Sequence, residues 1–290
     1  MCIAASSAQP TQTVYEIVQS DASFSRLKQA LDLSTDPAVQ ALVQRLKDNT
    51  TTTTFFAPNN NAFTAANGTV TASFLSYYLV PQTVSALADG QVLATLNALS
   101  SLNNQTQRVR VTKSGNAFNV NGNSPVQSST AAVNGFVYGI GQNLTVPVDL
   151  LTIVNSTAVL STLNQLIQLA GVGSVVRDTA GLMAFAPTTT AFNNLPAYVT
   201  SYLTRKAADS KAMLIKVLQY HLAGTLVYFG EQATNTSRLV QTVEGQTVRV
   251  DVSASRTYTV NSATVVSPDV LASNGVAHVI DQVGQLLTFI

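Results

Sequence analysis

One eight-residue phrase occurs twice in this chain and constrains its fold more than any other feature. The first copy runs from Phe56 to Phe63 and the second from Phe185 to Phe192. Five of the eight positions are identical, at an offset of 129 residues (185 minus 56). Because self-similarity at a fixed spacing is the mark of a repeat architecture, the chain is a tandem duplication.

Shorter segments repeat in the same order and at nearly the same spacing. Val109–Val111 corresponds to Val248–Val250, and Asn134–Val137 corresponds to Asn274–Ala277, at offsets of 139 (248 minus 109) and 140 (274 minus 134). A unit of about 140 residues is long enough to be an independent domain with its own core. We therefore expect a leader over residues 1–12, one domain over residues 13–146 and a second over residues 147–290.

Each unit shows a helical pattern first and a strand pattern after it. Apolar residues recur at helical spacing, and later valines alternate with polar residues as they do in hairpins. Helices grouped ahead of antiparallel hairpins predict an α+β domain, with the hairpins packed as a wedge or sandwich, and not a doubly wound parallel sheet. These segments are Val14–Leu31, Phe74–Leu79 and Val109–Val120 in the first unit, and Leu214–Leu222 and Val248–Val260 in the second.

The repeated phrase fits a strand-to-helix corner. Proline fixes its own φ and pushes the preceding residue to extended geometry, and Asn59 or Thr188 directly after the proline can cap a helix. The Asn-Gly pairs at 134–135 and 274–275 precede apolar runs, so they predict turns with positive φ that lead into buried strands. Both motifs are interpreted as structural.

Composition excludes several classes of function. Only 10% of the residues are charged, the net charge is +1 and no segment is rich in Lys or Arg, so we expect no nucleic-acid partner. Although 46% of the residues are hydrophobic, the sequence contains no apolar run of 18 residues, so it predicts no transmembrane segment. The single cysteine, Cys2, allows no disulfide within the chain. No Cys or His cluster predicts a metal site, and no motif predicts a cofactor.

Six Asn-x-Ser/Thr sequons indicate a secreted glycoprotein, because glycans supply the solubility that so few charges cannot. The segment from Ala4 to Gln9 resembles the small-residue end of a secretory signal. We therefore expect an extracellular location, either secreted or associated with the cell surface. The sequon asparagines are Asn49, Asn67, Asn104, Asn143, Asn155 and Asn235.

The sequence also lacks the common catalytic motifs. There is no Gly-x-Ser-x-Gly elbow, no phosphate-binding glycine loop and no His-Glu-x-x-His, so we expect no enzymatic activity. His221 lies on an apolar helix face with Leu214 and Leu218 and is interpreted as a core residue. Tyr78 takes the same place in the first unit, so chemistry that needs an imidazole cannot be common to both units.

These phrases together resemble one known family. Thr54–Phe63 and Met183–Phe192 look like the first signature of fasciclin-like domains, and Val133–Ile140 and Ser273–Asp281 look like the second. Leu218–Leu222 resembles the Tyr-His element of the family. The resemblance covers nearly the whole chain, twice and in the correct order. It implies cell adhesion, or association with matrix or cell wall, through contacts with a surface protein or a polysaccharide, with weak self-association as a further expectation.

The resemblance also implies candidate partner-binding residues. The acidic adhesion position of the family corresponds to Asp269, and the Tyr-His element to Tyr220 and His221. In the first unit Tyr77 and Tyr78 replace the Tyr-His pair, and Ser129 replaces the acid. If either domain binds a partner in this way, we expect it to be the second.

Two further functions stay open. A carrier of hydrophobic small molecules such as lipids would need a large lined pocket, which the hydrophobic content permits. A structural wall component would have no discrete ligand. Members of the family are often held by a C-terminal lipid anchor, but Phe289 and Ile290 end the chain without the spacer and tail of that signal. We therefore expect a processed or a soluble form.

Overall fold

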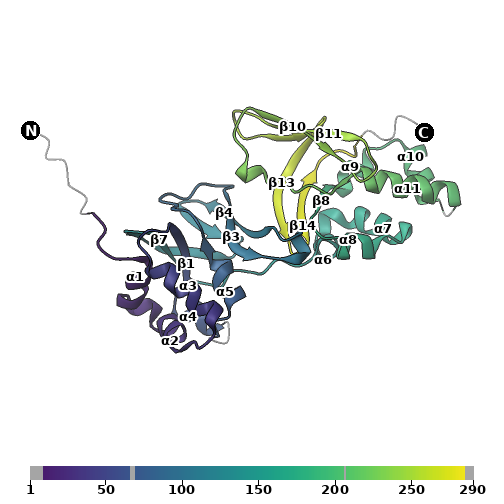
Figure 1. Ribbon diagram of the computed structural model, residues 1–290. Coiled ribbons are helices and arrows are strands. Elements are labelled where there is room, and N and C mark those ends of the chain that lie inside the picture. Colours follow the sequence, from purple (N-terminus) through teal and green to yellow (C-terminus); the bar gives the residue numbers. More distant parts are fainter. Residues whose placement is uncertain (1–8, 66–68, 206, 285–290) are drawn as a thin grey trace, which may run out of the picture. The chain divides into compact units, whose positions relative to one another are not determined.

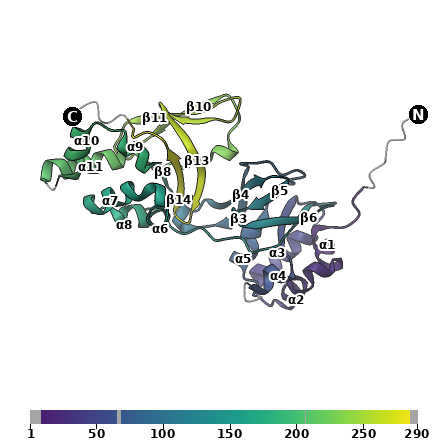
Figure 2. The ribbon, with the colours of Figure 1, turned by 180° about the vertical axis from the view of Figure 1, so that it is seen from behind.

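The computed structural model describes residues 9–65, 69–205 and 207–284. It divides into two compact units, one made of Met1–Ala98 and Thr106–Thr145, the other of Leu99–Gln105 and Val146–Ile290. Within the described residues each unit has its own seven-stranded sheet, with its helices gathered beside that sheet (Figures 1 and 2). Most of the expected leader and the sequon at Asn67 lie outside the described residues.

The first unit begins with a well-capped helix. The Thr13 hydroxyl accepts the Glu16 backbone N–H while the Glu16 carboxylate accepts the Thr13 N–H, so two backbone donors at the start of the helix are paired reciprocally. The helices are α1 (Val14–Ser20), η1 (Ala22–Phe24), α2 (Ser25–Leu33), α3 (Pro37–Lys47), α4 (Asn60–Ala65) and α5 (Ala72–Tyr78). The strands are β1 (Thr53–Pro58), β2 (Leu79–Val80), β3 (Val92–Ala98), β4 (Thr106–Ser114), β5 (Ala117–Val120), β6 (Ser124–Ala132) and β7 (Gly135–Ile140).

The strands of the first sheet follow the order β2-β1-β7-β6-β5-β4-β3. β1 and β7 run parallel, with Thr53 opposite Gly135 and Pro58 opposite Ile140, whereas the other neighbours are antiparallel. The α+β expectation is confirmed, and the sheet is mixed, because one parallel pair joins the antiparallel hairpins. A parallel pair needs a long crossover, and here the intervening helices and hairpins supply it.

The second unit repeats this plan. Its sheet has the order β10-β11-β12-β13-β14-β8-β9, and β8 runs parallel to β14. Its helices are η2 (Ser100–Leu102), α6 (Leu150–Ser156), η3 (Ala158–Leu160), α7 (Ser161–Ala170), α8 (Gly173–Asp178), α9 (Thr189–Asn193), α10 (Ala197–Thr204), α11 (Ala208–Tyr220) and η4 (Phe229–Glu231). Its strands are β8 (Leu182–Pro187), β9 (Leu222–Ala223), β10 (Thr236–Gln241), β11 (Thr247–Val252), β12 (Tyr258–Val260), β13 (Ala263–Ala272) and β14 (Gly275–Ile280).

The repeated phrase forms the predicted strand-to-helix corner in both units. β1 and β8 end at the prolines, and the Asn59 and Thr188 side chains accept the backbone N–H of Ala62 and Ala191 at 2.9 and 3.1 Å. The capping prediction is therefore confirmed. Two details differ. Leu79 and Leu222, expected in helices, lie in the short strands β2 and β9, because their backbones pair with β1 and β8.

Each core lies between the helices and the sheet, and the strands β1 and β8, each next to a short edge strand, are buried along their whole length. Within residues 9–65, 69–205 and 207–284, no single helix combines the length and apolar composition needed to cross a bilayer. The pair Leu150–Ser156 and Ala158–Ala170 meets that criterion only jointly, across a bend of 102°.

Candidate functional site

The Tyr-His element ends α11 with both side chains buried. His221 is 5% exposed; its Nδ1 lies 2.7 Å from the Val217 carbonyl oxygen, and its Nε2 accepts the Gly284 N–H at 2.9 Å. A carbonyl can only accept and a backbone N–H can only donate, so the imidazole is neutral with its proton on Nδ1. Burial lowers the pKa of His221, which keeps the ring in this form.

The first unit makes the equivalent contact with a tyrosine. Tyr78 is 2% exposed, and its Oη accepts the Leu144 N–H at 3.0 Å, as His221 accepts the N–H of Gly284. Burial raises the pKa of Tyr78 to about 12. The phenol and the imidazole therefore have the same structural role: each anchors the segment that follows β7 or β14.

The preceding tyrosines also correspond. Tyr77 and Tyr220 are buried, and each Oη accepts a side-chain N–H, from Asn121 at 2.7 Å and from Asn261 at 3.1 Å. Burial raises the pKa of both phenols. Each asparagine has a positive φ of 52°, and its Oδ1 accepts a backbone N–H from the neighbouring strand, so it ties the hairpin to the end of the helix.

Asp269 holds a loop and is not presented to solvent. It is 2% exposed, and its two oxygens accept the backbone N–H groups of Phe229 and Gly230, both at 2.7 Å. Its own N–H donates to His278 Nδ1 at 3.2 Å. Two charge-assisted bonds stabilise the buried carboxylate and cap η4. In the first unit Ser129, which takes this position, is exposed.

His278 repeats the exchange of histidine for tyrosine. Its Nε2 lies 2.9 Å from the Val227 carbonyl oxygen, and in the first unit Tyr138 donates to the Val84 carbonyl at the same distance. The chain has two histidines, and both occupy positions that the first unit fills with tyrosine. The five candidate partner-binding residues are thus buried within their own domains, which argues against direct contact with a partner.

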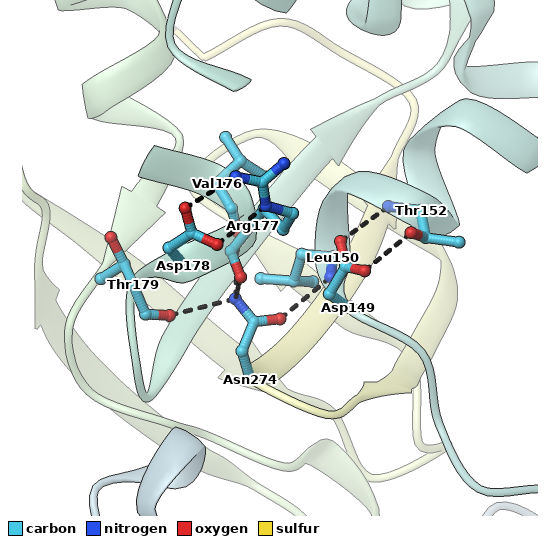
Figure 3. A network of polar contacts seen from close by, with 8 residues as sticks. All are labelled: Asp149, Leu150, Thr152, Val176, Arg177, Asp178, Thr179 and Asn274. Carbon is cyan, nitrogen blue, oxygen red and sulfur yellow. Dashed lines mark hydrogen bonds and ion pairs between the residues drawn. The ribbon is translucent and has the colours of Figure 1, made fainter. Parts of the chain in front are cut away.

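The second signature contains a buried amide, Asn274, whose Asn-Gly pair predicted a turn and not a long-range contact. Figure 3 shows Asn274 between the start of α6 and the end of α8. Its Oδ1 accepts the Leu150 N–H at 2.9 Å, and its Nδ2 lies 3.0 Å from the carbonyl oxygens of Val176, Arg177 and Thr179. The amide therefore satisfies the helix termini α6 and α8 together.

The first unit contains the same clamp, followed by a glycine with no room for a side chain. Asn134 accepts the Val14 N–H and donates to the carbonyls of Leu46 and Asp48. A Cβ on Gly135 would lie 1.7 Å from the Thr53 carbonyl oxygen, and φ is +152°. The positive φ predicted for the Asn-Gly turns is present at Gly135 and absent at Gly275. In both units the missing side chain allows the strand that begins at the glycine to approach β1 or β8 closely.

Most of the sequon asparagines are accessible. Asn49, Asn104, Asn155 and Asn235 are exposed. Asn143 is half-buried: its Nδ2 donates to the Ala62 carbonyl at 2.6 Å, and its Oδ1 accepts the Tyr78 hydroxyl at 3.1 Å. An amide engaged at both ends is a poor glycan acceptor.

The second unit also carries an open groove of about 500 Å³. It lies between α10 with the segment before it and the segment that leaves β14, and its lining includes Leu195, Val199 and Val283. In the part of the chain that the structure describes, no three His, Cys, Asp or Glu residues gather as metal ligands would.

The family model for the fasciclin domain matches residues 22–147 and 158–284, one match in each unit. The chain belongs to the fasciclin domain family. The two signatures therefore correspond to the corner that ends β1 and β8 and to the Asn-Gly clamp that begins β7 and β14.

Individual relatives match one domain each. Stabilin-2 of Rattus norvegicus is 32% identical over 110 residues, which is 37% of this chain and 7% of that protein. An uncharacterized protein of Synechocystis sp. is 33% identical over 124 residues, covering 42% of this chain and 86% of its own length. A second Synechocystis protein is 36% identical over 123 residues and is covered to 65%.

Among solved structures, a FAS1 domain pair from the insect cell adhesion molecule fasciclin I aligns with 19% identity and a TM-score of 0.45. The alignment covers 89% of this chain and 96% of that one.

Proposed function

We propose that this fasciclin domain pair is a non-catalytic adhesion module of a secreted or cell-surface glycoprotein, which binds a matrix or cell-surface protein or polysaccharide. The observation that carries the proposal is that both halves belong to the fasciclin family, because resemblance to this family implies adhesion. The exposed sequons at Asn49, Asn104, Asn155 and Asn235 support the extracellular part, because glycans attach at accessible loops and helix ends.

Binding would then use exposed surfaces instead of the Tyr-His elements. One such surface is the strip Gln127–Ala131 on β6, where five consecutive residues are exposed in the middle of the first sheet. Its amide and hydroxyl groups donate and accept hydrogen bonds without carrying charge. The corresponding segment of the second unit, Ser267–Leu271, is less accessible, and Asp269 within it holds η4.

The test uses the full chain secreted from a eukaryotic host and immobilised on a surface. We expect cells to adhere, and at least one matrix protein or insoluble polysaccharide to bind. Thr130→Glu puts a charge on the strip and should weaken that binding. Thr225→Glu changes another exposed threonine, in the second unit, and serves as the control.

Three outcomes would count against the proposal. Equal adhesion of the wild type and both variants would show that the strip does not bind the partner. Absence of cell, protein and polysaccharide binding would contradict adhesion itself. If in addition lipids raised the melting temperature, a carrier of hydrophobic molecules would replace the adhesion proposal.

A further inference from the structure

The groove of the second unit has the size of a small-molecule site. Its volume of about 500 Å³ lies within the range of about 300–1,000 Å³ typical of such sites. The floor includes Val199 and Val283, which are 3% and 9% exposed. Tyr198 also lines the groove and is 64% exposed, so its ring is accessible to a ligand.

The groove belongs to a part of the second unit that the first unit does not share. Phe63 and Tyr77 are 14 positions apart (77 minus 63), whereas Phe192 and Tyr220 are 28 apart (220 minus 192). The additional residues provide α10, which forms one wall.

The opposite wall differs as well, because Val283 stands where the first unit has Asn143, at the offset of 140 residues. In the first unit the Asn143 amide closes onto the Ala62 carbonyl at 2.6 Å. In the second unit Val283 and Ala191, the counterparts of Asn143 and Ala62, both line the groove.

The polar groups of the lining select among ligands. Asn194 and Gln282 provide carboxamides and Asp281 provides a carboxylate. Asp281 Oδ1 accepts the Thr264 N–H at 2.7 Å and Gln282 Oε1 accepts the Ser262 hydroxyl at 3.2 Å, so the groups that remain for a ligand are the Asn194 amide, Gln282 Nε2 and Asp281 Oδ2. Among the described lining residues, Asp281 is the one that carries a charge. Its carboxylate repels anions, so a fatty acid, a phosphate or a sulfated glycan is disfavoured. A buried acyl chain would also need a more completely apolar wall.

From this lining we infer that the groove is a binding site for a neutral saccharide, with the sugar hydroxyls on Asn194, Asp281 and Gln282 and an apolar sugar face on Tyr198. An aromatic ring presents a flat apolar surface with a partly negative face, which suits the C–H groups on one side of a pyranose. The inference rests on the proposed adhesion function, for which it names polysaccharide as the partner class and the second domain as its site.

Calorimetric titration of the full chain tests the site. The probes are the neutral hexasaccharides cellohexaose, laminarihexaose and chitohexaose, with a heparin hexasaccharide and oleate as anionic comparators. We expect at least one neutral probe to bind, and its Kd to rise at least tenfold in Tyr198→Ala. Asn194→Trp, which fills the groove from an exposed position, should have the same effect. Leu33→Ala removes an equally exposed apolar side chain of the first unit and should leave the Kd unchanged.

Several results would overturn the site: no binding of the three neutral probes, an unchanged Kd in both groove variants, or preferential binding of an anionic comparator. The melting temperature of each variant, measured on the same samples, separates loss of the site from loss of the fold. Cell adhesion is scored in parallel. Adhesion without saccharide binding overturns the groove and keeps the adhesion proposal, whereas saccharide binding without adhesion keeps the groove and overturns the adhesion proposal.

Discussion

Acidification should destabilise the second domain selectively, because its core contains histidine where the first has tyrosine. Protonation of His221 Nε2 would remove the acceptor of the Gly284 N–H and place a charge in the core. An unfolded histidine titrates near pH 6.5, whereas burial lowers the pKa of folded His221. Between the two values the unfolded state binds a proton that the folded state does not, so the free energy of unfolding falls as the pH drops below about 6.5.

The size of the effect follows from the same linkage. One pH unit below the unfolded pKa lowers the free energy of unfolding by at most about 1.4 kcal/mol. At pH 5, roughly 1.5 units below, the loss is at most about 2 kcal/mol, or about 30-fold in the opening equilibrium. Tyr78 keeps its proton throughout this range because burial raises its pKa to about 12.

Native-state hydrogen exchange read by mass spectrometry can follow both domains in one sample. Peptides from α11 and β14 should lose protection between pH 7.5 and pH 5, after correction for the intrinsic rate, while peptides from α5 and β7 should not. His221→Gln is the control, because a carboxamide can donate to Val217 and accept from Gly284 without titrating. His278, the other histidine of the domain, faces Asp269 and is unchanged in this variant. Equal losses in both domains, or an undiminished loss in His221→Gln, would refute the reasoning.

Three further predictions concern the clamp, the close strand approach and the sequons. Asn274→Ala leaves three carbonyls and the Leu150 N–H without their partner, so urea unfolding should show a loss of about 3 kcal/mol or more; a loss below about 1 kcal/mol would contradict the clamp. Gly275→Ala puts a Cβ 1.7 Å from the Leu182 carbonyl oxygen and should lower the melting temperature sharply, whereas Gly224→Ala, with nothing within 4 Å, should change it little; similar melting temperatures would argue against the steric reasoning. Asn143 should stay unmodified while the exposed sequons carry glycans, and a glycan on Asn143 in peptide mapping would show that its amide is free.

The parts of the fold that depend on local sequence could be predicted. The helix-then-hairpin order follows from the change in apolar period, and the caps at Asn59 and Thr188 bond to residues only three positions away. The parallel pairing of β1 with β7 could not be predicted from local pattern, because Thr53 and Gly135 are 82 positions apart (135 minus 53). α3 and α10 were also not foreseen.

The candidate site was predictable only in part. Helical spacing placed His221 on an apolar face, and the structure buries it there. The clamp was missed because the bonds of Asn274 reach back 95 to 124 positions, to elements that no local pattern connects. The longer spacing before Tyr220 is visible in the sequence, but the shape that α10 gives to the groove is not. The groove was therefore not predicted.

We propose that Asp269 and the Tyr-His element stabilise the second domain while exposed surfaces bind the partner. Asp269→Ser tests it, because it copies Ser129 of the first unit and removes the acceptor of the Phe229 and Gly230 N–H groups. Melting temperature and cell adhesion are measured on the same preparation, with adhesion scored below the melting transition. The account predicts a lower melting temperature and unchanged adhesion per folded molecule. Lost adhesion with an unchanged melting temperature would contradict it and make Asp269 a contact residue.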